Sequence, residues 1–155
     1  IDTSGGCHSL TDIFDIHDYE QNTETFFKRY SPLAADGECC TDGCDPKGMP
    51  FFTDFYTYKK GTPVCMSEYG GMKWPPEKSG GWGYGDDLKT EEDFINRYRC
   101  LTEQLLFNKN MFGFCYTQLY DVEQEQNGLY TYDREPKFDM NIFKKINSQT
   151  ADIEK

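Results

Sequence analysis

The sequence predicts an α/β protein in which parallel strands alternate with helices. Three runs of β-branched, aromatic or other apolar residues, at 12–17, 64–68 and 111–119, each precede a segment whose apolar positions have helical spacing. The third run is nearly apolar throughout, as expected of a strand covered on both faces. This order of elements is typical of parallel βα units, and 155 residues suit a single domain.

The first unit consists of the strand at 12–17 and a short helix at 23–29. A loop rich in Gly, Asp and Cys follows at about 35–50. The second unit opens after a proline with the strand at 64–68, and the glycine pair at 70–71 ends it.

A glycine- and proline-rich loop at 72–85 follows the second strand and carries both tryptophans of the chain, Trp74 and Trp82. A lone loop tryptophan can simply fill a core. Two of them on one glycine-hinged loop favour a binding lip instead.

The clearest helix begins at Thr90, a good N-cap residue, with Asp93 at the capping-box position. Apolar residues at helical spacing then form one buried stripe: Phe94, Tyr98, Leu101 and Leu105. After the third strand, the sequence predicts a turn at 127–128, a short strand-like segment at 129–132 and a final helix near 138–146.

Composition excludes several classes of function. A net charge of −11, from 27 acidic and 16 basic residues, leaves no basic face for nucleic acid. No apolar run is long enough for a transmembrane helix, so no membrane partner is expected. Aromatic residues make up 16% of the chain although mean hydropathy is −0.79, which fits either an aromatic core or a sugar-binding pocket. The first residues resemble neither a signal peptide nor a natural start, so we expect the chain to begin in mid-sequence.

Seven cysteines are an odd number, which leaves at least one unpaired and favours a cytoplasmic location. Cys65 and Cys115 lie in apolar runs and are expected to be buried. The cluster Cys39, Cys40 and Cys44 could be reduced thiols or a local disulfide, and its spacing fits zinc poorly. We therefore predict no metal site. No cofactor is expected either, because no dinucleotide or phosphate-loop motif is present.

Polar residues recur where the predicted strands end: His17, Asp18 and Tyr19 after the first, Glu68 and Tyr69 after the second, and 118–121 after the third. Functional residues at the carboxyl ends of parallel strands are typical of a (β/α)8 barrel. Three units cannot close a barrel, which needs about 250 residues. The predicted fold is therefore a partial (β/α)8 TIM barrel.

Glu68 is the strongest candidate for chemistry because it ends a buried strand just before two glycines that let a ligand approach closely. The alternative is an ordinary surface glutamate. His17 and Asp18 could hydrogen-bond sugar hydroxyls or simply cap the following turn. A serine hydrolase is disfavoured, since no Gly-x-Ser-x-Gly motif occurs and Ser67 precedes an acid.

The segments 15–19, 63–71 and 112–137 closely resemble the last part of the catalytic barrel of glycoside hydrolase family 2. That family holds β-galactosidases, β-glucuronidases and β-mannosidases. The opening residues 3–6 look like the loop after its fifth strand, and 113–134 resembles its eighth strand and the segment beyond. The resemblance implies that residues 1–155 form roughly strands six to eight of the barrel, with their helices.

By this resemblance Glu68 matches the family's nucleophile at the end of strand seven, in a β-galactosidase-like enzyme. Tyr116 matches a strand-eight position that often holds a tryptophan forming the sugar platform, and His17 falls at a substrate-contacting position of strand six. Together with the strand-end and loop positions above, the expected substrate-binding residues are His17, Asp18, Tyr69, Trp74, Trp82 and Tyr116.

A retaining glycosidase needs two carboxylates about 5–5.5 Å apart. The resemblance places the acid/base glutamate on strand four, before residue 1, so the chain alone is expected to be inactive. The expected partners are a carbohydrate substrate, the N-terminal remainder of the enzyme, which would cover open strand edges, and a second copy of the chain. The alternative is a non-catalytic carbohydrate-binding or assembly piece that uses Trp74, Trp82 and Tyr116.

Overall fold

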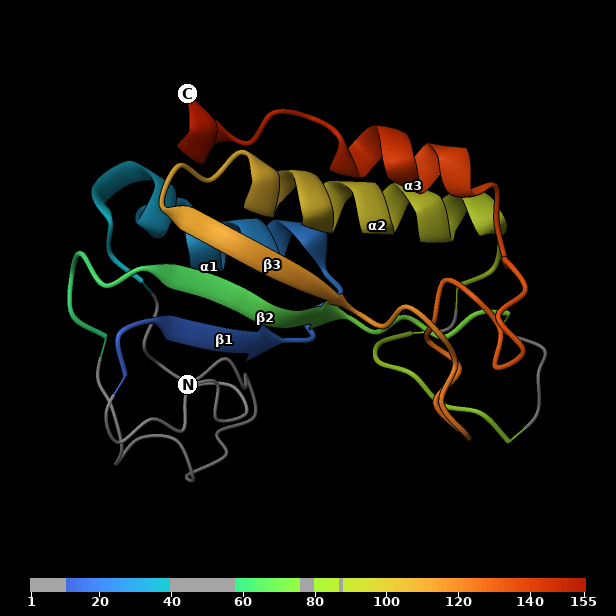
Figure 1. Ribbon diagram of the computed structural model, residues 1–155. Coiled ribbons are helices and arrows are strands. Elements are labelled where there is room, and N and C mark those ends of the chain that lie inside the picture. Colours follow the sequence, from blue (N-terminus) through green and yellow to red (C-terminus); the bar gives the residue numbers. More distant parts are fainter. Residues whose placement is uncertain (1–10, 40–57, 76–79, 87) are drawn as a thin grey trace.

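A computed structural model of the chain describes residues 11–39, 58–75, 80–86 and 88–155. In this part of the chain three parallel strands form one sheet in the order β1–β2–β3, with three helices beside it (Figure 1). The elements in chain order are β1 (Phe14–Asp18), α1 (Thr23–Asp36), β2 (Val64–Gly70), α2 (Glu91–Leu106), β3 (Met111–Thr117), α3 (Met140–Asn147) and a 3₁₀ turn (Asp152–Glu154). The α/β class and the parallel sheet are confirmed.

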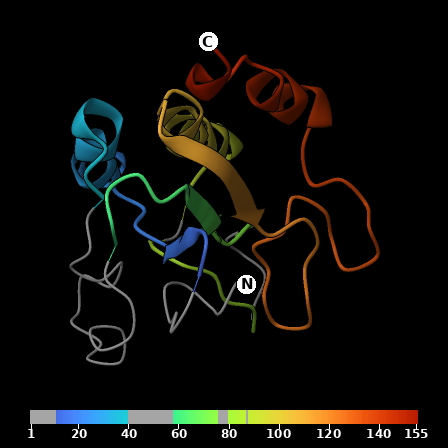
Figure 2. The same cartoon turned by 60° about the vertical axis from the view of Figure 1, so that its left-hand side comes forward.

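All three helices lie on the same side of the sheet, as the two views of the ribbon show (Figure 1, Figure 2). Apolar side chains of the strands pack there against the helices in one cluster: Phe14, Ile16, Val64, Met66 and Tyr69 with Phe26, Leu33, Leu101 and Leu105. A sheet wound in both directions would carry helices on both faces. Helices on one face are compatible with a segment of a βα barrel, whose helices all lie outside.

The strand positions that alternate with this apolar set belong to the opposite face of the sheet, because successive side chains on a strand point to opposite sides. That second face carries mostly polar and sulfur-bearing residues: Asp15, His17, Cys65, Ser67 and Cys115. The division explains how a chain with a mean hydropathy of −0.79 still builds an aromatic-rich core.

Helix α1 is longer than predicted, since it runs from Thr23 to Asp36 rather than ending at 29. The buried positions Phe26, Tyr30 and Leu33 continue one stripe across the whole helix. Pro32 lies inside the helix, where it lacks the N–H that would bond the Lys28 carbonyl. The Ser31 hydroxyl donates to that carbonyl at 3.5 Å, which lessens the loss.

Helix α2 forms as its sequence indicates. The Thr90 hydroxyl accepts from the Asp93 N–H and the Asp93 carboxylate accepts from the Thr90 N–H, both at 3.1 Å, so the predicted capping box is present. The predicted stripe is buried, from Phe94 through Tyr98 and Leu101 to Leu105. Part of it, with α3, builds a second hydrophobic cluster around Phe138.

The prediction that the third strand is covered on both faces is wrong. Phe112 is 45% exposed and Cys115 is exposed, whereas Cys65, on the neighbouring strand, is half-buried. In the described part of the chain β3 pairs only with β2, so one edge of β3 has no strand beside it. An apolar strand sequence predicts burial, but it does not show whether the segments that would bury the strand belong to these 155 residues.

Smaller differences concern the C-terminal third. The segment predicted as strand-like at 129–132 forms only isolated bridges, from Tyr130 to Tyr120 and to Pro136. Helix α3 begins at Met140 rather than 138. Among the described residues no helix is long and apolar enough to cross a membrane, and no group of His, Cys, Asp or Glu could hold a metal ion.

Two predictions fall outside the described residues. Of the cysteine cluster, Cys39 is buried, but Cys40 and Cys44 lie in the stretch that is not described, and so do residues 3–6.

Candidate functional site

Glu68 lies at the carboxyl end of β2, beside the carboxyl end of β1. Both strands are irregular here: β1 shifts register between Ile16 and His17, and β2 between Met66 and Tyr69. These bulges bring His17 opposite Glu68, and His17 Nδ1 lies 3.2 Å from Glu68 Oε2. Bulges commonly re-aim a side chain next to a functional site.

Tyr19 makes the second contact to the same carboxylate oxygen, since its hydroxyl donates to Glu68 Oε2. No described residue hydrogen-bonds Oε1, and the Glu68 side chain is 39% exposed. One carboxylate oxygen is therefore held by the protein while the other is open to a ligand.

The Tyr19 ring stacks on the ring of Tyr84, with centroids 3.6 Å apart and an interplanar angle of 12°. Burial, followed by the hydrogen bond to Glu68, raises the pKa of the Tyr19 phenol. Tyr19 therefore stays protonated and remains a donor to Glu68 at any ordinary pH. Gly71 makes the stack possible: its φ is +67°, and a Cβ there would lie 2.6 Å from Tyr84.

Sequence reasoning missed this tyrosine pair as part of the site. Tyr19 belongs to the strand-end group with His17 and Asp18 but was not among the predicted substrate-binding residues, and Tyr84 is 65 positions later in the glycine-rich loop. The available signal was the place of Tyr19 in that strand-end group.

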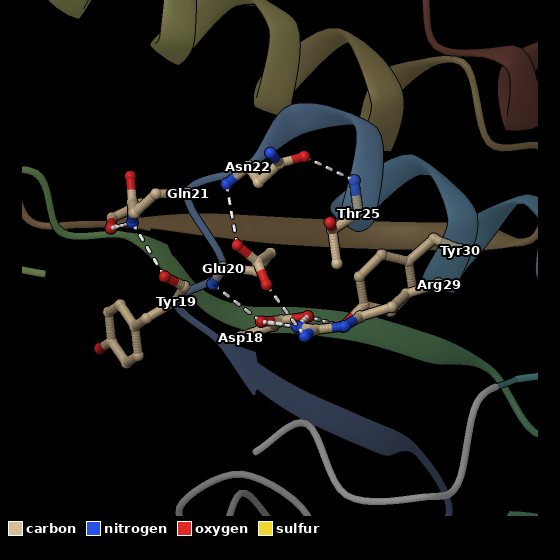
Figure 3. Close-up of polar contacts among 9 residues, drawn as sticks. Asp18, Tyr19, Glu20, Gln21, Asn22, Thr25, Arg29 and Tyr30 are labelled. Carbon is tan, nitrogen blue, oxygen red and sulfur yellow. Dashed lines mark hydrogen bonds and ion pairs between the residues drawn. The ribbon is translucent and has the colours of Figure 1, made fainter. Parts of the chain in front are cut away.

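Asp18, predicted to contact substrate, is directed instead to α1 (Figure 3). Its carboxylate is fully buried and receives Arg29 Nη1 at 2.7 and 2.8 Å, the Tyr30 hydroxyl at 2.7 Å and the Glu20 N–H at 2.9 Å. Arg29 Nη2 also reaches Glu20 at 3.0 Å. These partners use both carboxylate oxygens, so Asp18 braces the turn that carries Tyr19 and does not face the same side of the sheet as Glu68.

Tyr69 and Tyr116 also lie on the helix side of the sheet. Tyr69 is fully buried, and its hydroxyl shares a 2.8 Å hydrogen bond with Thr102 of α2. The Tyr116 ring packs at steep angles on Tyr69 and Tyr98, with centroids 5.6 and 5.0 Å away. Both rings therefore act as core residues here.

The two tryptophans are not together. Trp74 packs into the second hydrophobic cluster, with its ring 6.0 Å from that of Phe138. Trp82 is 39% exposed and meets Tyr84 edge-to-face at 5.5 Å. Of the two predicted lip residues, Trp82 alone adjoins the Tyr19–Tyr84 stack through described contacts.

A polar strip follows the end of β3. Thr117 pairs with Gly70 two residues after Glu68, and the Thr117–Gln118 peptide bond is cis. Gln118 Nε2 donates to Asn127 Oδ1 at 2.8 Å and approaches Glu125 Oε2 at 3.4 Å. The sequence predicts polar residues at 118–121, but none of this strip was among the predicted substrate-binding residues.

The fold resembles those of three solved bacterial proteins. One is the Faecalibacterium prausnitzii enzyme, with 20% identity and a TM-score of 0.53 over 91% of this chain and 22% of that chain. A second comes from Bifidobacterium dentium, solved with coumarin-3-O-glucuronide, with 16% identity and a TM-score of 0.53 over 92% and 22%. The third, from Bacteroides uniformis, has 16% identity and a TM-score of 0.52 over 85% and 15%. All three are β-glucuronidases.

Identities of this size show a shared fold and no more. The chain spans between 15% and 22% of the length of the β-glucuronidases to which it is similar. No protein-family model matches the chain. No curated protein sequence matches it either.

Proposed function

We propose that this chain is part of a retaining β-glycoside hydrolase of the glycoside hydrolase family 2 type, and that Glu68 is its nucleophile. The observation that carries the proposal is the Glu68 carboxylate, with Oε2 held by Tyr19 and His17 and Oε1 open. The fold likeness to three β-glucuronidases supports the same class of enzyme.

In the proposed first step, Glu68 Oε1 attacks the anomeric carbon of the bound sugar and the bond to the leaving-group oxygen breaks. A glycosyl ester forms on Glu68 while an acid from the rest of the enzyme protonates the leaving oxygen. Water then attacks the anomeric carbon and gives up its proton to the residue that had protonated the leaving oxygen. The ester bond breaks, which releases the sugar and restores the Glu68 carboxylate. The Tyr19 hydroxyl orients the carboxylate throughout.

The remainder of the enzyme would supply the second carboxylate and complete a (β/α)8 barrel, in which residues 1–155 contribute roughly strands six to eight. The one-sided helices and the polar second face of the sheet favour this arrangement. The interior of a barrel is the face opposite its helices, where His17 also lies.

The test is mechanism-based labelling of the full-length protein with 2-fluoro β-glycosides, followed by peptide mass spectrometry. We expect an adduct on Glu68 and none in Glu68→Gln, with turnover reduced by roughly 10⁴-fold or more in that variant. The matched control is Glu24→Gln, an exposed glutamate of α1, which should label and turn over normally.

Labelling on another carboxylate would refute the role of Glu68. Saturable binding of sugar without any adduct would instead support a non-catalytic carbohydrate-binding protein. Of the three rings named for that alternative, Trp82 is the exposed one, because Trp74 and Tyr116 pack against the core clusters.

A further inference from the structure

A second carboxylate, Glu125, lies by the end of β3, on a segment that bridges to the loop carrying Tyr84. Glu125 is half-buried, and its backbone forms reciprocal hydrogen bonds with Val122 at 2.8 and 3.0 Å. It also bridges to Trp82, the residue whose ring meets Tyr84. Its carboxylate lies by Gln118, at the end of β3. Glu125 is therefore held in place by backbone pairing rather than left on a loose loop.

Both carboxylates act on the same phenol. Burial raises the pKa of Tyr84, and the negative charges of Glu125 and then Glu68 raise it further. Tyr84 in turn stacks on Tyr19, which donates to Glu68. Glu68 accepts from Tyr19 at the end of β2 and Glu125 lies by Gln118 at the end of β3, so this end of the described sheet carries two carboxylates.

Two described cations are already paired with other carboxylates. Arg29 is paired with Asp18 and Glu20, and buried Lys137 is paired with Asp121 at 2.6 Å. Lys73 lies near the loop, since its backbone nitrogen would be 2.6 Å from a Cβ added at Gly83. In the described part of the chain its ammonium group forms no ion pair.

From this geometry, and resting on the proposed function, we infer that the site takes uncharged glycosides and rejects sugars that carry a carboxylate. We assign Glu125 as the residue that sets this specificity. A uronic acid would bring one further anion to an end of the sheet that already carries Glu68 and Glu125. At an effective dielectric constant of about 20, two like charges within about 10 Å of each other disfavour binding by roughly 10-fold or more. The adjoining Gln118 amide and Glu125 carboxylate suit hydroxyl groups, which can both donate and accept.

The experiment compares kcat/KM of the full-length protein on 4-nitrophenyl β-D-galactoside, β-D-glucoside and β-D-glucuronide. We expect one of the neutral substrates to exceed the glucuronide by at least roughly 100-fold. Glu125→Gln should raise the glucuronide-to-neutral ratio by about 10-fold or more. The matched control, Glu123→Gln, changes an exposed glutamate two residues away and should leave that ratio unaltered.

Salt provides a readout that needs no variant. Added sodium chloride screens like-charge repulsion, so glucuronide hydrolysis should rise with ionic strength relative to the neutral substrate. Preference for the glucuronide, or a ratio that neither salt nor Glu125→Gln moves, would overturn this inference while leaving the proposed function intact. If the protein prefers the glucuronide and Lys73→Met abolishes that preference, Lys73 binds the sugar carboxylate and the inference is wrong. Turnover of none of the three substrates, with no adduct on Glu68, would overturn both.

Discussion

The brace around Asp18 gives the sharpest stability prediction, for the substitution Arg29→Met. The change keeps most of the apolar stem of Arg29 but leaves the Asp18 carboxylate buried without its cation. Removing one partner of a buried ion pair costs about 3–5 kcal/mol. The lower end applies here, because the Tyr30 hydroxyl and the Glu20 N–H still donate to Asp18.

A loss of about 3 kcal/mol is large against the roughly 5–15 kcal/mol by which a domain is stable. With a slope of about 2 kcal/mol per M, it should lower the midpoint of urea unfolding by about 1.5 M. The assay is urea unfolding of the chain followed by tryptophan fluorescence. Trp74 reports the core directly, since its ring packs on Phe94 and Phe138.

The control for this prediction is the neighbouring residue of the same helix. Lys28 pairs with Glu24 at 2.8 Å, but both side chains are more than 70% exposed. Lys28→Met should therefore cost no more than about 0.5 kcal/mol. Equal midpoints for the Lys28 and Arg29 variants would refute the view that Arg29 neutralises a buried charge.

Three further predictions follow from packing, exposure and burial. A Cβ at Gly128 would lie 2.3 and 2.4 Å from backbone atoms of the neighbouring turn, so Gly128→Ala should destabilise by about 3 kcal/mol in urea unfolding. Gly113→Ala, which meets only a sulfur atom at 3.4 Å, should cost less than about 1 kcal/mol. Cys115 is exposed and should react with a thiol reagent in this chain. If the barrel closes over it in the full-length protein, its reaction rate should fall at least roughly 10-fold. Cys100, exposed on α2, is the control and should react at the same rate in both proteins. The raised phenol pKa of Tyr19 means that the folded state holds this proton more tightly than the unfolded state does. Its contribution to the free energy of unfolding is therefore complete below about pH 10 and falls as pH rises above that value. Tyr19→Phe should lessen this alkaline loss of stability in unfolding measured across about pH 9–12.

The sequence alone was sufficient for features that depend on local signals. The Thr90 capping box and the apolar stripe of α2 are encoded within a single helix, and both are present. Strand positions were also found, although β1 begins at Phe14 and β2 continues to Gly70. Features that depend on distant segments were not predictable in this way. The Tyr19–Tyr84 stack joins the segments that follow β1 and β2, so its geometry requires the pairing of these two strands.

The predicted site residues show why position along a strand is not enough. They included two adjacent pairs, His17 with Asp18 and Glu68 with Tyr69, yet successive strand residues point to opposite faces. One member of each pair must therefore face the helices. Asp18 does so to hold Arg29, and Tyr69 does so to reach Thr102. His17 and Glu68 remain on the face without helices, where His17 Nδ1 lies 3.2 Å from Glu68 Oε2. The same alternation therefore divides the strand ends into a supporting set, Asp18 and Tyr69, and a second set, His17 and Glu68, on the face without helices.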